Sequence, residues 1–205
     1  ALITDAGTPG ISDPGEDLVR ICYEQGIEVT SLPGAAACIT ALTLSGLPTR
    51  RFSFEAFLPK EKKERAAVLE ELKNDTRTLI VYEAPHHLLG TLKELQNALG
   101  DRRLTVCREL TKKFETAFQT TFSEAIRYYE EQGVRGECVL VIEGRSREEL
   151  VQEAQQSWEA ISVEEHMEHY LSTGMDRKSA MKQVAKDRGV GKREIYQMLL
   201  KAENE

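Results

Sequence analysis

The sequence predicts an α/β protein with two successive α/β regions, residues 1–48 and 49–145, followed by a helical region, residues 146–205. Three observations support this fold class. Short apolar runs alternate with helical patterns up to residue 144, which is typical of helices packed on a sheet. Glycine- and proline-containing turns separate these runs. Strand patterns stop at Arg145, and only helical periodicity follows.

The first region is predicted to have the order strand, helix, strand, helix. Gly26 follows a helix with an apolar stripe, and Pro33-Gly34 opens a helix of small residues. The expected elements are residues 1–4, Glu16–Gln25, Ile27–Leu32 and Ala35–Ser45. This order is typical of a mostly parallel sheet.

The second region is predicted to form a partly antiparallel sheet with helices. Its expected strands, which are rich in β-branched and aromatic residues, are Phe52–Phe57, Thr78–Tyr82, Leu104–Cys107, Thr116–Phe122 and Cys138–Glu143. Its expected helices are Lys60–Lys73, Pro85–Leu99 and Ser123–Gln132. Ser123 is the expected N-cap of the last of these helices.

The third region is predicted to be helical throughout. The expected helices are Glu148–Ala160, Val163–Leu171, Arg177–Arg188 and Lys192–Lys201. The last two flank the short turn Gly189-Val190-Gly191 and share an apolar face, a pattern that resembles a helix-turn-helix unit.

Composition indicates a cytoplasmic globular protein. No apolar run is long enough to span a bilayer, and no secretory signal is present. The 4 cysteines lie in apolar stretches without CxxC spacing, which favours reduced, buried thiols. The pairs His86-His87 and His166-x-x-His169 lack convincing further ligands, so no metal site is predicted.

The charge is distributed unevenly along the chain. The net charge is −7, yet residues 174–201 contain eight basic and three acidic residues, a net +5. A basic segment on an acidic body is typical of a contact surface for nucleic acid. In a helix-turn-helix unit the start of the second helix approaches the nucleic acid. The predicted RNA-contacting residues of this segment are Lys182, Lys186, Arg188, Lys192 and Arg193.

The most informative motif is LITDAGTPGISDPG, residues 2–15. An apolar run ends in an acidic residue, a loop with three glycines and two prolines follows, and a helical pattern comes next. Ligands bind to α/β sheets at such loops, beyond the carboxyl ends of strands. The pattern is neither a GxGxxG fingerprint nor a P-loop.

DAGTPGISDPG resembles the corresponding motif of the tetrapyrrole methylase superfamily, and in particular of its bacterial ribosomal RNA 2′-O-ribose methyltransferases. Further motifs of that group follow in order: LPGAAACITAL (32–42), SGLPT (45–49), FLPKEKKER (57–65), TLIVYEAPHHL (78–88), RELTKKFE (108–115) and RGECVLVIEG (135–144). His87 stands where the group usually has arginine, and Thr120 where it usually has glycine.

The resemblance implies two α/β layers with S-adenosylmethionine bound in the cleft between them, and a C-terminal helical appendage. The implied cofactor-binding residues are Asp5, Gly7, Thr8, Pro9, Ile11, Ser12, Pro33, Ala35, Ala36, Tyr82, Glu83, Ala84 and Leu110. The family has roughly a further half-domain upstream. The first layer is therefore expected to be truncated here, and this 205-residue chain to bind the cofactor weakly or not at all.

The resemblance also implies methylation of a cytidine ribose in small-subunit ribosomal RNA by a homodimer. A ribose hydroxyl is a poor nucleophile, so a group that accepts its proton or stabilises the alkoxide is expected. Glu83, Glu109 and Lys112 are the main candidates, with Asp5 and His86 also within the matching motifs. The sequence does not choose among them.

In RELTKKFE, Arg108 and Lys112 are also candidates for contacting an RNA phosphate. Two alternatives to RNA methylation stay open. The first is methylation of a tetrapyrrole precursor, which the basic C-terminal segment disfavours. The second is a non-catalytic nucleic-acid-binding protein based on the terminal helices, which leaves residues 1–144 without a role.

Overall fold

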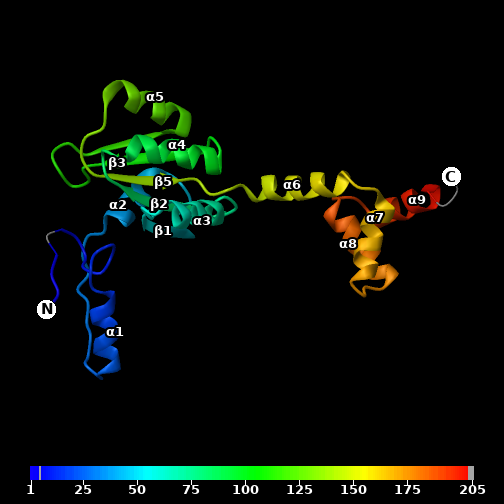
Figure 1. Ribbon diagram of the computed structural model, residues 1–205, viewed down its shortest axis with the longest axis horizontal. Helices are drawn as coiled ribbons and strands as arrows, with labels where there is room; N and C mark the ends of the chain where they lie inside the picture. The colour runs from blue at the N-terminus through cyan, green and yellow to red at the C-terminus, as the bar shows by residue number, and fades with distance from the viewer. Residues whose placement is uncertain (5, 203–205) are drawn as a thin grey trace. The chain divides into compact units, whose positions relative to one another are not determined.

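The structure is a computed structural model that describes residues 1–4 and 6–202. It divides into two compact units, Ala1–Arg145 and Ser146–Glu205. The first unit contains a mixed sheet with helices, and the described part of the second is helical (Figure 1). The α/β class and the helical C-terminal region are confirmed. No helix in the described part of the chain combines the length and hydropathy needed to cross a membrane.

The first unit is built on a five-stranded sheet with the order β1-β2-β5-β3-β4. The strands are β1 (Phe52–Phe57), β2 (Thr78–Glu83), β3 (Arg103–Arg108), β4 (Thr116–Thr121) and β5 (Cys138–Ile142). β1 and β2 are parallel, whereas β5 is antiparallel to β2 and β3, and β4 is antiparallel to β3. The strands predicted between residues 49 and 145 are confirmed, in a partly antiparallel sheet.

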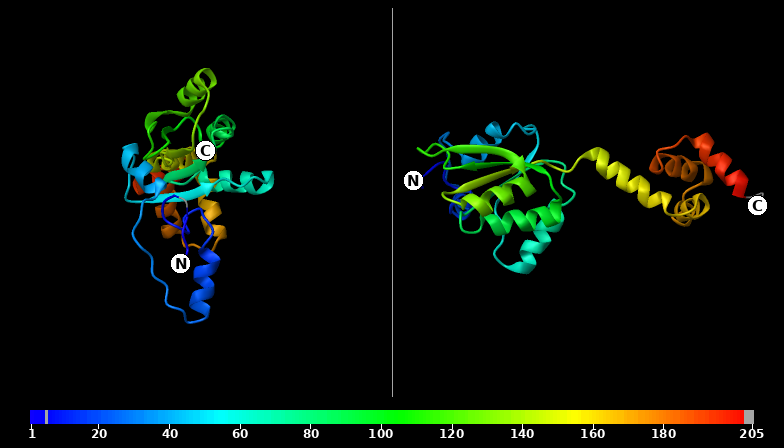
Figure 2. Two further views of the ribbon diagram at one scale, coloured as in Figure 1. Left: turned by 90° about the vertical axis from the view of Figure 1, so that its left-hand side faces the viewer. Right: turned by 90° about the horizontal axis from the view of Figure 1, so that it is seen from above.

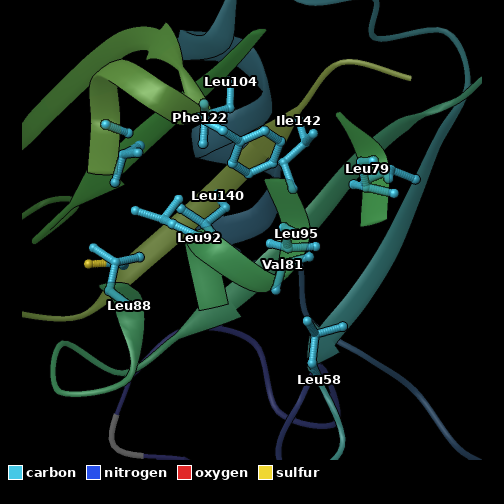
Figure 3. Packing of buried hydrophobic residues seen from close by; sticks show 14 of the residues in the cluster. Leu58, Leu79, Val81, Leu88, Leu92, Leu95, Leu104, Phe122, Leu140 and Ile142 are labelled. Carbon is cyan, nitrogen blue, oxygen red and sulfur yellow. The ribbon is translucent and has the colours of Figure 1, made fainter. Parts of the chain in front are cut away.

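The two faces of this sheet pack against different helices. Along β2, Leu79 and Val81 belong to one apolar cluster, and Ile80 and Tyr82 to another, because successive side chains of a strand point to opposite faces. The first cluster, part of which Figure 3 shows, is covered by α3, α4 and α5, and the second by α2 on the other face of the sheet (Figure 2, right). The helices of this unit are α1 (Glu16–Glu24), α2 (Ala37–Ser45), α3 (Lys62–Leu72), α4 (Leu88–Leu99) and α5 (Phe122–Gln132).

The C-terminal end of α2 is fixed to the sheet by hydrogen bonds. Thr105 Oγ1 and Gln119 Nε2 each donate to the Ser45 carbonyl at 3.2 Å. Gly46 ends the helix in the left-handed conformation, with φ of 70°, which glycine adopts without a Cβ clash. The sheet therefore satisfies a carbonyl that the helix itself leaves without a partner.

The first 36 residues differ from the sequence-based expectation. Helix α1 forms as predicted, but the strands expected at residues 1–4 and 27–32 do not. Helix α1 buries none of its residues, and Leu18 and Ile21 remain 49% and 46% exposed. A strand is stable only beside a hydrogen-bonding neighbour, and these segments have no strand partner within the described residues. The expected parallel sheet of residues 1–48 is thus not formed.

One predicted helix cap is also wrong. Thr121, not Ser123, is the N-cap of α5, because the Thr121 hydroxyl accepts the Glu124 N–H. Ser123 lies inside the first turn, where its hydroxyl and N–H both donate to the Asp101 carboxylate. The strand β4 runs directly into the helix, which moves the cap two residues toward the N-terminus.

The second unit is a small helical domain with its own core. Its helices are α6 (Arg147–Glu159), α7 (Val163–Ser172), α8 (Arg177–Asp187) and α9 (Lys192–Ala202), which confirms the four predicted helices. Ser146, Ser162 and Asp176 cap the first three of these helices, as such residues commonly do. Buried Val184 and Ile195 lie in the cluster that joins α7, α8 and α9.

Candidate cofactor site and basic pocket

The carboxyl ends of β2 and β3 lie at the same end of the sheet, on either side of β5; we call this end the sheet edge. Both strands are antiparallel to β5, and both Glu83 and Arg108 pair with Cys138 at its start. The segments that follow them, residues 84–88 and 109–115, therefore leave the sheet at the same end, one on each side of β5. The motifs YEAPHH and RELTKKFE, which are separated by 20 residues in the chain, lie at the same end of the sheet for this reason.

The loop before α2 is attached to this edge through Tyr82. The Cys38 N–H in the first turn of α2 donates to the Tyr82 hydroxyl at 2.9 Å. The N-cap residue Ala36 has no side chain able to cap the helix, so the tyrosine takes that role. Burial and the neighbouring Cys38 raise the pKa of Tyr82 to about 12, which keeps the hydroxyl protonated.

The glycine-rich first loop contacts the same segment. The Thr8 N–H and hydroxyl donate to the Ala35 carbonyl at 2.9 and 3.0 Å. A Cβ on Gly7, whose φ is +76°, would lie 3.1 Å from that carbonyl. A Cβ on Gly34 would lie 2.9 Å from Thr8 Oγ1. The two loops approach so closely that a side chain at either glycine would require a shift of its neighbour, and at Gly7 the positive φ adds strain.

Ala36, Tyr82 and Leu110 all pack against the apolar cluster beneath α2, which contains Cys107 and Val139. Hydrogen bonds and packing thus bring together one residue or more from each of the four predicted cofactor segments. Sequence order alone did not specify this convergence. The contacts involve mostly backbone groups, small side chains and one tyrosine.

The remaining predicted cofactor residues are placed less specifically. Ile11 is 42% exposed, Pro33 is exposed, and Ser12 has a left-handed backbone, with φ of 64°. Pro9 lies in the same loop as Thr8. Asp5 lies outside the described residues.

Glu83 is buried in a network on the α4 side of the sheet edge. Its carboxylate accepts the Thr91 hydroxyl at 2.6 Å and the Ala84 N–H at 2.9 Å. Thr91 in turn accepts a hydrogen bond from Arg65, which pairs with Glu94 at 2.6 Å. With both oxygens engaged and only 7% of the residue exposed, Glu83 is suited to holding β2 against α4.

Glu109 and Lys112 form a more accessible charged group after β3. Lys112 Nζ lies 3.3 Å from Glu109 Oε1 and 3.2 Å from Glu137 Oε2, which raises the pKa of the lysine. Glu109 Oε1 also accepts the Glu137 N–H at 3.1 Å. The Glu109 side chain covers Gly136, where an added Cβ would lie 2.5 Å away from it.

Backbone strain is concentrated in this loop. Glu109 and Thr111 have φ of 48° and 64°, a region that residues with a Cβ rarely occupy. The Glu115 carboxylate accepts the Thr111 N–H at 2.5 Å and so stabilises the unusual turn. Strained turns of this kind cluster at functional sites, where the surrounding structure maintains them.

The other candidates near this edge have different surroundings. Arg108 donates to the Thr116 hydroxyl at 3.2 Å and to the Arg135 carbonyl at 3.1 Å, so its guanidinium joins two neighbouring segments. His86 is exposed and lies against His87, with ring centroids 4.1 Å apart. No group of three or more potential metal ligands is found among the described residues.

In the second unit, the N-terminal turns of α8 and α9 border an open surface pocket of about 600 Å³. We call it the basic pocket; its lining residues are Arg177, Lys178, Met181, Lys192, Arg193 and Tyr196. Of the predicted RNA-contacting residues, it includes Lys192 and Arg193 and leaves out Lys182 and Lys186. Met181 and Tyr196 were not among the sequence candidates, although Tyr196 follows Arg193 by three residues on one helix face.

Arg188, also a predicted RNA contact, is engaged inside the unit. Its guanidinium donates to His166 Nδ1 at 3.1 Å and to the carbonyls of Ile161 and Ser162 at 2.6 and 2.9 Å. His166 is fully buried and stacks on Trp158, with ring centroids 3.9 Å apart. Arg188 therefore joins the end of α8 to the turn between α6 and α7.

Comparison with known proteins gives a consistent result. The family model for tetrapyrrole (corrin/porphyrin) methylases matches residues 1–126. The chain is 47% identical to ribosomal RNA small subunit methyltransferase I of Halalkalibacterium halodurans and 48% identical to that of Bacillus subtilis. Each match covers 96% of this chain and 67% of the relative, so the chain spans about two thirds of the length of these relatives.

Among solved structures, cobalt precorrin-4 methyltransferase, a cobalamin biosynthetic enzyme, has a similar fold. Its TM-score is 0.51 at 17% sequence identity, and the match covers 67% of this chain and 61% of the other. At that identity the likeness concerns the fold alone.

Proposed function

The chain belongs to the tetrapyrrole methylase family, and we propose that it transfers a methyl group from S-adenosylmethionine to a ribose 2′-hydroxyl of a cytidine in small-subunit ribosomal RNA. The names of the relatives support the RNA substrate. The sequence resemblance supports the position on the ribose and the base. The observation that carries the proposal is the convergence of four predicted cofactor segments at one sheet edge.

The residues at this edge fit such a cofactor. Gly7 and Gly34 lie where an added Cβ would press on the neighbouring loop, so the two backbones can approach each other closely. Ala35 and Ala36 add only small side chains, and Tyr82 fixes the loop to β2. A nucleoside with an amino-acid tail is suited to binding by such backbone groups.

When bound, S-adenosylmethionine supplies a methyl group on a positively charged sulfur, which is already activated for displacement. The loops at residues 7–9 and 33–36 bind and orient the donor. In the reaction the ribose oxygen gains the methyl group and releases its proton, and the electrons of the broken carbon–sulfur bond stay on sulfur. No metal is required for this balance.

For the proton, we favour Glu109 and Lys112 over Glu83. Both Glu83 oxygens are engaged with Ala84 and Thr91 inside the protein. Lys112 is about half exposed, and its raised pKa keeps it positively charged, so it is suited to stabilising the developing alkoxide. Glu109 lies beside it on a strained turn and is suited to accepting the proton.

The test is transfer of a labelled methyl group to small ribosomal subunits that lack the modification, with tetrapyrrole precursors as the competing substrate. Lys112→Ala is expected to lower kcat at least tenfold while cofactor affinity is kept. Lys113→Ala is the matched control, because Lys113 lies in the same loop over the Phe114 ring, 5.5 Å from its centroid. Methylation of a tetrapyrrole but not of ribosomal subunits would refute the proposed substrate.

Two further properties belong to the proposal. The protein acts as a homodimer, and it acts in the cytoplasm, where ribosomal subunits are assembled. Light scattering over a range of protein concentrations measures the first: a mass twice that of the 23.1 kDa chain is expected. A concentration-independent monomer mass would refute it.

A further inference from the structure

The basic pocket has a composition that neither a solvated helix surface nor an ordinary apolar core requires. Four cationic side chains, from the first turns of α8 and α9, surround an apolar floor. Met181 is buried in the unit's core, whereas Tyr196 is 52% exposed and presents part of its ring to the pocket. Cations thus surround an exposed aromatic ring in a space of about 600 Å³.

The fold holds these groups in place. Ala180 on α8 and Ile195 on α9 are fully buried in one cluster, which fixes the two helices against each other. The nearest acidic side chain on α8, Asp176, is occupied as the N-cap, where it accepts the N–H groups of Lys178 and Ser179. The described residues that line the pocket include no carboxylate, and the nearest acidic residues along the chain are Asp176 and Glu194, each next to a lining residue.

This chemistry matches one class of ligand. Arginine and lysine side chains bind phosphate oxygens, and two arginines with two lysines favour a polyanion. An exposed aromatic ring among such cations stacks on an unpaired base, the combination typical of proteins that bind single-stranded nucleic acid. A duplex offers phosphates to the cations but no free base face to Tyr196, because its bases are stacked on one another.

We propose that the basic pocket binds one nucleotide of single-stranded RNA, with the phosphate on Lys178, Lys192 and Arg193 and the base on Tyr196. The choice of RNA rests on the proposed function, whereas the preference for a phosphate and an unpaired base follows from the pocket. This differs from a helix-turn-helix unit that reads a duplex groove with its second helix. The pocket contributes to RNA affinity and not to methyl transfer.

The experiment is fluorescence anisotropy with a labelled single-stranded RNA decamer and with the same decamer in a duplex, without cofactor. The single strand is expected to bind more tightly. Tyr196→Ala is expected to weaken its binding at least about fivefold, whereas Tyr196→Phe stays within about twofold, because Phe keeps the stacking face. Thermal unfolding, followed by the fluorescence of Trp158 in the same unit, checks that each variant is folded.

The cations are tested by the salt dependence of binding. The double variant Lys192→Ala/Arg193→Ala is expected to flatten the log–log slope by about 0.7 for each phosphate that the protein no longer neutralises. The double variant Arg147→Ala/Lys201→Ala removes the same charge from the same unit outside the pocket, and its slope is expected to stay close to that of the parent.

Tighter binding of the duplex, or an unchanged affinity of Tyr196→Ala, would overturn the inference. Displacement of the RNA by polyglutamate at equal charge concentration would also overturn it, in favour of an acidic protein partner. The inference and the proposed function fail separately. If the protein transfers the methyl group but Tyr196→Ala does not change its RNA affinity, only the pocket is refuted. If RNA binding depends on Tyr196 but no methyl group is transferred, only the enzyme activity is refuted.

Discussion

Replacing Tyr82 by phenylalanine tests whether the sheet edge holds the second cofactor loop in place. The ring is expected to stay packed against Phe54 and Phe57, whose centroids lie 5.0 and 5.7 Å away. The single change is removal of the hydrogen bond from the Cys38 N–H, 2.9 Å long. The substitution therefore isolates one polar interaction from the apolar packing around it.

The cost follows from the surroundings of that N–H group. Cys38 is only 5% exposed, and its N-cap residue Ala36 offers no replacement acceptor. Leaving a buried donor unsatisfied costs about 1–3 kcal/mol, and losing a helix cap about 1 kcal/mol. We expect a local loss of about 1–2 kcal/mol. If the cofactor binds only when the loop is in place, its affinity falls about five- to thirtyfold.

The assay is calorimetric binding of S-adenosylmethionine together with thermal unfolding. Tyr129→Phe is the matched control, because Tyr129 is 3% exposed and lies in the cluster on the opposite face of the sheet. It is expected to leave cofactor affinity unchanged. Parent-like affinity for Tyr82→Phe would refute the role of this tyrosine as an anchor, and an equal loss in both variants would indicate general destabilisation.

Three further outcomes are expected. Ala36→Leu is expected to abolish cofactor binding while thermal stability is largely kept, because Ala36 is only partly buried and lies in a predicted cofactor loop; lost stability with normal affinity would indicate that its packing against the cluster beneath α2 matters instead. Gly136→Ala lowers kcat, because an added Cβ would displace the Glu109 side chain, and an unchanged kcat would argue against Glu109 as a catalytic group. Burial lowers the pKa of His166 below 6.5, so the unfolded chain gains a proton at higher pH than the folded unit does. The second unit is therefore expected to lose stability as the pH is lowered from 7.5 to 5.5, and the urea midpoint, followed by Trp158 fluorescence, is expected to decrease over that range. His166→Phe is expected to remove most of this pH dependence, and a parent-like dependence would assign it to other groups.

The sequence by itself determined most of the local structure. The four C-terminal helices follow from apolar periodicity and from capping residues such as Ser162 and Asp176, all within a few residues of the helices they specify. The strands between residues 49 and 145 follow from β-branched and aromatic runs. The motifs also indicated four predicted cofactor segments, which the structure brings together at one sheet edge. These features depend on neighbours along the chain, so a single sequence contains them.

The tertiary structure decided which of these residues act together. The antiparallel placement of β5 brings Glu83 and Arg108 to one edge, and no local pattern specifies that pairing. The hydrogen bond between Tyr82 and Cys38 spans 44 residues, and the basic pocket exists only because α8 and α9 pack together. The apolar runs at residues 1–4 and 27–32 show the converse, because a strand-like sequence becomes a strand only where another strand completes its backbone hydrogen bonds.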